Sequence, residues 1–222
     1  SPCSARSPTR MVAAGRSTLS QAVLLGWPVL SLLHRAAARR MRWKNGLGWT
    51  TELASQPTRD ELVQGEFDWR VSIAEVDADA EFSAFPGIDR SILVLAGAGM
   101  LLEVGERAPV ELRERGKPLR FSGDSPARAS LLGGPTRDFN VMTRRGVFDH
   151  LLTSATLGPP LPLERAPGRV WLVHVLRGHA VLDSLQVEAD DSVLCECESG
   201  DAAPLLVRGA GELVLVQLDR AG

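Results

Sequence analysis

The feature that most constrains this chain is a series of short apolar runs interrupted by glycine. Residues 90–104 read as a strand, a turn at 97–99 and a second strand, and residues 169–183 repeat the pattern around Gly178. Residues 204–218 repeat it again around positions 209–211. Runs of Val and Leu joined through glycine are typical of β-hairpins. Many such strands at close spacing predict an all-β sandwich or barrel.

Two of these predicted hairpins also share a spacing. The sequence Val-Leu-x-Gly that ends at Gly97 recurs 81 residues later, ending at Gly178, and a leucine follows four positions on in both copies. Turn chemistry alone could produce this echo, but we favour a duplicated unit. The Pro-rich stretch 156–168 lies between the copies and predicts a linker or edge segment, because proline cannot donate to a central ladder. We therefore predict a first domain at 29–155 and a smaller second domain at 156–222.

Residues 1–28 are rich in Ser, Ala and Arg and contain no acidic residue. They could be a leader peptide, a disordered tail, or an artefact of the translation start, since Met11 could itself be a start. Pro28 interrupts the apolar run at 22–33, which favours the tail or the artefact.

Composition narrows the class of partner and compartment. The formal net charge of -2 gives no general attraction to nucleic acid or to a membrane surface. No run reaches the roughly 18 apolar residues that a transmembrane helix requires. Three cysteines are too few for a disulfide scaffold, so we expect a reducing, cytoplasmic location.

The Val-Leu-x-Gly hairpins resemble those of the cupin family of jelly-roll barrels. Metal-binding cupins carry a His-x-His motif and then a glutamate seven residues before that glycine. Counted back from Gly97, the glutamate position holds Arg90. The histidine positions fall on Ser83 and Phe85, or on their neighbours at 84 and 86.

None of these positions is histidine, and neither are the corresponding ones counted from Gly178, which are Trp171 and residues 164–167. No histidine occurs between His34 and His150. We therefore predict no metal site and no cofactor in the first domain. In the second domain, two histidines and two cysteines could be combined into a zinc site: His174, His179, Cys195 and Cys197. Their spacing does not require a zinc site, and we favour ordinary packing and surface roles for these side chains.

Three strand-like segments, at 48–54, 67–76 and 134–145, carry polar residues at alternate positions. On an open sheet such a face would be wet, whereas in a small closed barrel it could line a ligand pocket. Arginine together with amide and hydroxyl groups suits a small carboxylate, which needs a bidentate fork and neutral donors. The alternate positions are Thr50 and Glu52, Arg70 and Ser72, and Asp138, Asn140, Met142 and Arg144.

A predicted turn precedes the first of these segments. Asn45-Gly46 is a strong tight-turn signal, flanked by Trp43 and Lys44. Lys44 is one of only two lysines in a chain with 23 arginines, so its compact charge could be functional. Spacing alone favours an exposed turn with a solvated lysine.

Longer strings from about residue 29 to 146 resemble the HutD/Ves family. They are RMRWKNGLGWTTELA at 40–54, FDWRVSIAEVDADAEFSAFPGIDRSILVLAGAGMLLEV at 67–104 and GGPTRDFNVMTRR at 133–145. The resemblance implies a double-cupin fold without the usual metal ligands. It also implies a link to bacterial histidine utilisation, in which the family is thought to bind a small acid. The family's usual MPWKNG departs here at Arg42, which replaces the proline.

The resemblance favours the interpretation that the alternating polar residues line a ligand pocket rather than face solvent. It also implies the functional hypotheses that follow. The leading hypothesis is a cytoplasmic, metal-free binding protein for a small carboxylate resembling formylglutamate or urocanate, with a regulatory or accessory role. A metal-independent enzyme with Glu52 as general base, and an oligomeric scaffold with an unused barrel, remain alternatives; a homodimer is left open. Asp138 or Arg145 could be structural ion-pair partners. The expected ligand-binding residues are Trp43, Lys44, Asn45, Thr50, Glu52, Arg70, Ser72, Arg90, Asn140, Met142 and Arg144.

Overall fold

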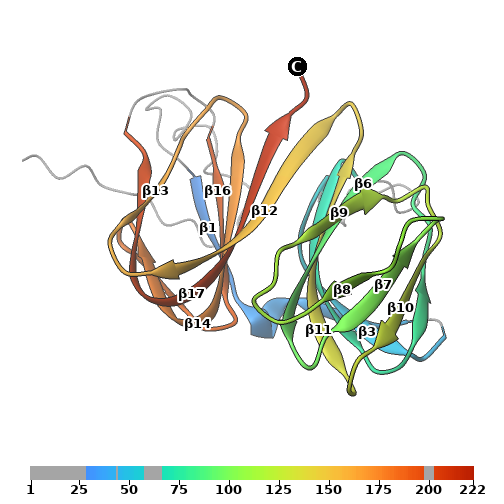
Figure 1. The fold of residues 1–222 in the computed structure, drawn as a ribbon. Helices are drawn as coiled ribbons and strands as arrows, with labels where there is room; N and C mark the ends of the chain where they lie inside the picture. Colours follow the sequence, from blue (N-terminus) through green and yellow to red (C-terminus); the bar gives the residue numbers. More distant parts are fainter. Residues whose placement is uncertain (1–28, 44, 58–66, 198–202) are drawn as a thin grey trace, which may run out of the picture. The chain divides into compact units, whose positions relative to one another are not determined.

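The structure, a computed structural model, describes residues 29–43, 45–57, 67–197 and 203–222 (Figure 1). The predicted extension at 1–28 and Lys44 lie outside the described residues. Within the described part, the secondary structure consists of antiparallel strands and one short 3-10 helix, η2, at Arg35–Ala37. None of the described helical structure is long and apolar enough to cross a membrane. The all-β prediction is confirmed.

The chain divides into two compact units. One, which we call the site unit, comprises His34–Ser154 together with Val214–Gly222. The second unit comprises the described residues 29–33 together with Ala155–Leu213. Compared with the predicted boundaries of 29–155 and 156–222, the first few described residues group with the second unit and the last nine with the site unit.

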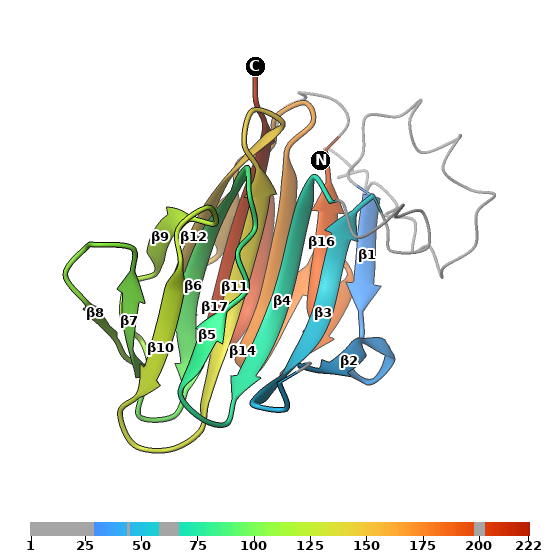
Figure 2. The ribbon, with the colours of Figure 1, turned by 90° about the vertical axis from the view of Figure 1, so that its right-hand side faces the viewer.

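Two sheets build the site unit. Figure 2 shows strands of the larger sheet running side by side; its order is β2-β3-β4-β11-β6-β9, and that of the smaller is β5-β10-β7-β8. The larger sheet contains β2 (Arg39–Arg42), β3 (Gly48–Gln56), β4 (Trp69–Val76), β6 (Ile88–Ala96), β9 (Leu119–Ser122) and β11 (Thr136–Arg144). The smaller contains β5 (Ala80–Phe82), β7 (Met100–Val104), β8 (Val110–Leu112) and β10 (Ala127–Leu131).

One apolar cluster joins these two sheets face to face. It combines side chains such as Val76 and Val94 of the larger sheet with Met100, Leu102 and Ala129 of the smaller. All five are nearly inaccessible to water. Strand side chains alternate between faces, so the same inner face of β4, β11 and β6 must also carry the even-numbered polar residues of those strands.

The strands of the second unit belong to a seven-stranded sheet with the order β1-β16-β14-β17-β12. Two short strands are added at its margins: β13 pairs with β17, and β15 pairs with β14. The strand bounds are β1 (Val29–Leu33), β12 (Phe148–Leu157), β13 (Leu161–Leu163), β14 (Val170–Leu182), β15 (Leu185–Glu188), β16 (Ser192–Glu196) and β17 (Leu205–Arg220).

The three predicted glycine turns have different outcomes. The one at 97–99 does connect β6 to β7, but the predicted hairpin does not form, because these two strands belong to different sheets. The turns at Gly178 and at 209–211 are wrong, because β14 and β17 run through these glycines without a break. A Cβ at Gly178 would lie 2.0 Å from the Ala210 carbonyl oxygen, and one at Gly211 would lie 1.9 Å from that of Arg177. These glycines therefore permit close backbone approach between neighbouring strands, a second reason for glycine within a strand.

Candidate functional site

The inner face of the larger sheet carries three rows of side chains across β4, β11 and β6. Cross-strand partners in antiparallel strands project to the same side, so each row follows from the pairing register. The rows become less charged along the strands, from two guanidinium groups around a thioether to one carboxyl group between two apolar side chains. In order, they are Arg70–Met142–Arg90, Ser72–Asn140–Ile92 and Ala74–Asp138–Val94.

These rows form one wall of a cavity of about 440 Å³ within the site unit. A volume of this size suits a small organic ligand. The lining side chains come from β2, β3, β4, β5, β6 and β11 and from the loops after β2 and β5. They are Met41, Arg42, Trp43, Asn45, Thr50, Arg70, Ser72, Ala74, Glu81, Phe82, Ser83, Phe85, Arg90, Asp138, Asn140 and Met142.

The turn between β2 and β3 supplies one rim of this cavity. Asn45 accepts a hydrogen bond at Oδ1 from the backbone N–H of Leu47, at 3.0 Å, which fixes the predicted turn. Trp43 donates from its indole N–H to Thr50 Oγ1 at 2.8 Å. Its ring also meets Phe82 edge-on, with the centroids 6.1 Å apart. The turn is therefore more than an exposed connection, because it brings two lining side chains into place.

Arg70 is the first of the two guanidinium groups of the rows. Its Nε lies 2.9 Å from Glu52 Oε2, and both side chains are mostly buried. Glu52 does not itself line the cavity. A carboxylate held in this way balances the charge of Arg70, which weakens the hypothesis that Glu52 is a general base acting on a bound substrate.

Arg90 is the second guanidinium group and is 4% exposed. It donates from Nη1 to the Ser83 carbonyl oxygen at 3.2 Å. Three phenylalanine rings surround its Cζ, at 5.4 Å for Phe82, 5.4 Å for Phe85 and 5.2 Å for Phe121. Cation–π attraction of this kind stabilises a guanidinium group that has lost its water. Among the described residues, no carboxylate oxygen lies within ion-pair distance of Arg90.

Burial lowers the pKa of Arg90 to about 10; attraction to Asp138 opposes this shift and repulsion by Arg70 adds to it. The group still carries its positive charge at neutral pH. Arg90 therefore presents a fixed cation at the cavity wall, in the position where the cupin spacing puts a metal-binding glutamate.

Asp138 exposes no surface to water, although it belongs to the cavity lining. Neither of its carboxyl oxygens has a hydrogen-bond donor among the described residues. Burial raises the pKa of Asp138 to about 7, against the attraction of Arg90. The hypothesis that Asp138 is a structural ion-pair partner is therefore wrong. The other candidate, Arg145, does pair with Asp89 and Asp124, at 3.0 and 2.8 Å.

The structure brings most of the predicted site residues together. Of the predicted set, Glu52 does not line the cavity but pairs with Arg70, and Lys44 is not described. Arg144 does not line the cavity; it is about one-third exposed and lies 3.5 Å from Asp68. The predicted residues that line the cavity are Trp43, Asn45, Thr50, Arg70, Ser72, Arg90, Asn140 and Met142.

The prediction missed several lining residues, among them Asp138, Ser83 and Phe85. The last two stand at the positions that the cupin spacing assigns to metal-binding histidines, so that spacing was a signal for them. Among the described residues, no group of three or more His, Cys, Asp or Glu side chains could hold a metal ion. The zinc set considered above accordingly does not assemble; His174 instead contacts Ser192 through Nδ1 at 3.0 Å.

Comparisons with known proteins identify the family and the fold of this chain. A family model described as HutD matches residues 35–215. The protein Ves of Citrobacter koseri is 42% identical over 106 residues, which are 46% of this chain and 52% of Ves. The chain thus spans about half the length of that curated relative.

Two solved structures are similar over most of the chain. HutD from Pseudomonas fluorescens SBW25, solved in a formate condition, has a TM-score of 0.76 and 27% identity, covering 87% of this chain and all of that one. A conserved protein of unknown function from Pseudomonas aeruginosa PAO1 has a TM-score of 0.76 and 30% identity, covering 86% of this chain and 99% of its own. At 10% identity or below, a bacterial pirin and an oxalate decarboxylase share the fold alone. The predicted duplicated cupin fold is confirmed.

Proposed function

The chain belongs to the HutD family, and from this premise we propose that the cavity of its site unit binds a small carboxylate. The observation that carries the proposal is the placement of Arg70 and Arg90 in one cavity with unequal partners. Glu52 balances the charge of Arg70 at 2.9 Å, whereas aromatic rings surround Arg90. Arg90 is therefore a buried cation of the cavity lining without an acidic partner at ion-pair distance among the described residues, and a carboxylate matches the two-pronged geometry of its guanidinium group.

The remaining lining residues suit a small organic acid better than an inorganic anion. Ser72, Thr50 and Asn140 offer neutral polar groups, while Met142 and Phe85 offer apolar contact. A cavity that combines apolar walls with a few polar groups is typical of small-molecule sites. We propose a ligand resembling N-formylglutamate or urocanate and, from the family, a regulatory or accessory role in histidine utilisation.

A thermal-shift screen tests this proposal. The full chain is heated with formate, acetate, N-formyl-L-glutamate or urocanate, and with acetamide and N-formylglycinamide as uncharged controls. A ligand that binds only the folded state raises the midpoint by mass action. We expect at least one acid to raise the midpoint, the amides to leave it unchanged, and the acid to be recovered intact after incubation. If no acid shifts the midpoint, the proposal is wrong; consumption of the acid would indicate an enzyme.

A further inference from the structure

Asp138 is a fully buried acidic residue of the cavity lining, and carboxylate binding does not explain its presence there. It lies between Ala74 of β4 and Val94 of β6, its apolar cross-strand partners. The register of β11 against β6 shifts between Arg137 and Asp138. Such an irregularity re-aims side chains, and here it accompanies a carboxyl group on the inner face.

An ionised carboxylate in this place would be costly. Both oxygens are buried without a donor among the described residues, and an unsolvated charge is strongly disfavoured. The shift of its pKa to about 7 expresses this cost. This pKa puts the change between the neutral and charged forms of Asp138 near neutral pH, in the lining of the proposed binding site.

The charged groups that line the cavity around Asp138 come from four strands. They are Arg90 on β6, Arg70 on β4, Arg42 on β2 and Glu81 on β5. Glu52 holds Arg70, while Arg42 and Glu81 are exposed to solvent. Arg90 is the group whose charge acts on Asp138. An ionised Asp138 would compete with a ligand carboxylate for Arg90, whereas a protonated Asp138 would leave Arg90 to the ligand.

We infer that the cavity takes up its carboxylate together with one proton, and that Asp138 carries this proton. The inference rests on the proposed function and adds a pH dependence to it. Arrival of an anion beside Arg90 disfavours the charged form of Asp138, so its carboxylate takes up a proton as the ligand binds. The proton comes from a hydronium ion or a buffer acid, whose bond to it breaks as the Oδ–H bond forms. The protein consequently binds the acid more tightly as the surroundings acidify from pH 8 to pH 6.

Calorimetric titration with N-formyl-L-glutamate at pH 6.0, 7.0 and 8.0 measures this coupling directly. Both carboxyl groups of the probe stay ionised over this range, and His150 does not interfere because burial lowers its pKa to about 4. If binding requires one proton, the affinity falls as the pH rises above the pKa of Asp138, by at most about tenfold per pH unit. We expect wild-type affinity to fall about five- to tenfold between pH 6.0 and 8.0.

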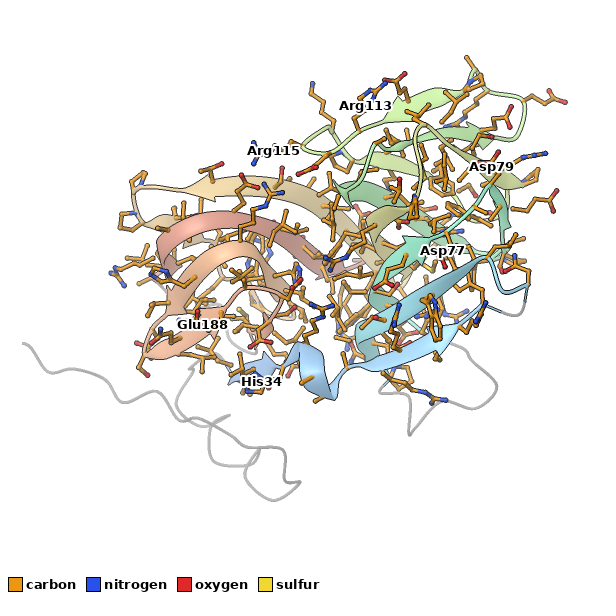
Figure 3. All side chains as sticks on the ribbon, turned by 90° about the horizontal axis from the view of Figure 1, so that it is seen from below. His34, Asp77, Asp79, Arg113, Arg115 and Glu188 are labelled. Carbon is orange, nitrogen blue, oxygen red and sulfur yellow. The ribbon has the colours of Figure 1, made fainter. Side chains whose placement is uncertain are left out.

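Two variants separate Asp138 from other acidic groups. Asp138→Asn mimics the protonated carboxyl group and should bind the probe equally well at pH 6.0 and 8.0. Asp77→Asn is the matched control, because Asp77 lies in the connection from β4 to β5 and does not line the cavity (Figure 3). It should retain the wild-type pH dependence.

A measurement on the wild-type protein alone does not depend on whether a variant folds. Titrations at pH 7.5 in two buffers of different ionisation enthalpy should reveal net uptake of a fraction of a proton, up to one, per probe bound. Equal wild-type affinity at pH 6.0 and 8.0, or a pH dependence that persists in Asp138→Asn, would overturn the inference alone. If N-formyl-L-glutamate, urocanate, acetate and formate all fail to bind at pH 6.0, the proposed function itself fails, and the inference with it.

Discussion

Arg70 and Glu52 form an ion pair beside the cavity, with Nε and Oε2 2.9 Å apart and side chains only 17% and 12% exposed. Glu52 lies one strand away from Arg70, on β3, and pairs through its backbone with Ser72. Glu52 therefore links β3 to two inward-facing residues of β4, to Arg70 through its side chain and to Ser72 through its backbone. It also distinguishes Arg70 from Arg90, the other buried arginine of the cavity lining, which has no acidic partner at this distance among the described residues.

Removal of Arg70 alone should harm ligand binding more than removal of the pair. In Arg70→Ala, the charge of Glu52 is left uncompensated next to the cavity, so affinity for a small carboxylate should fall by about 2–5 kcal/mol. The double variant Arg70→Ala/Glu52→Gln removes both charges and should recover most of the loss. Calorimetry of the wild type, both single variants and the double variant measures this coupling. A double variant as weak as Arg70→Ala would contradict the charge-balancing role.

Asp138→Asn should make the protein more stable at alkaline pH. The pKa of Asp138 is raised to about 7 in the folded state from 3.8 in the unfolded state, so the folded state holds the extra proton. Stability in the wild type is therefore lost as pH rises from about 4 to about 7, and the loss reaches at most about 4 kcal/mol. Asparagine does not ionise, so the variant does not lose this stability as the pH rises.

Urea unfolding of the ligand-free protein at pH 4, 6 and 8 checks this expectation. The two proteins should have similar stability at pH 4, and the advantage of Asp138→Asn should grow up to pH 8. The difference between them cancels the contribution of His150, which titrates at lower pH. A constant difference across the series would show that Asp138 does not titrate in the folded protein.

Alternation along the strands was sufficient to predict much of the site. In β4 and β11 it placed Arg70, Ser72, Asn140 and Met142 on one face, and the structure puts these four in the cavity lining. The same rule included Arg144, which fails because it is the last residue of β11 and reaches Asp68 instead. Position along a strand depends on where the opposing sheet ends, which periodicity does not encode.

The role of Asp138 could not be predicted from its own strand. Its environment depends on Ala74 and Val94, which are distant in sequence and become its neighbours only through the pairing register. Glycine gave a similarly incomplete signal. Sequence alone does not distinguish a glycine that reverses the chain, as at Gly97, from one that lets two strands approach closely, as at Gly178.

Alanine substitutions test these two uses of glycine. Gly97 has φ +98° and a Cβ there would lie 2.5 Å from the Pro135 carbonyl oxygen; Gly178 has φ +81° and the contact with Ala210 described above. Each substitution should destabilise the protein by at least about 1–3 kcal/mol. Gly158→Ala is the control, because Gly158 has open space around it and no positive φ. It should change the free energy of unfolding by less than about 0.5 kcal/mol. A mild effect at Gly178 would mean that the strands can separate there at little cost.

Transition metal should not accompany the purified protein. The cavity presents Ser83, Phe85 and Arg90 where metal-binding cupins carry their ligands, and a guanidinium group that stays protonated at neutral pH offers no lone pair to a metal. We expect elemental analysis to find well under one metal ion per chain, and a chelator to leave the melting midpoint unchanged. One metal ion per chain, lost with a drop in the midpoint on chelation, would refute this.

Two arginine variants, compared at pH 6.0, test most directly whether Arg90 binds the carboxylate of the ligand. Arg90→Met removes the positive charge that the phenylalanine rings surround, while keeping a long apolar side chain among those rings. Arg144→Met removes a cation that lies at the end of β11 outside the cavity. Calorimetric titration of each variant and the wild type with N-formyl-L-glutamate and acetate measures the affinities. We expect Arg90→Met to lose at least about tenfold in affinity for whichever acid binds the wild type, and Arg144→Met to keep wild-type affinity. Undiminished binding by Arg90→Met would contradict this expectation.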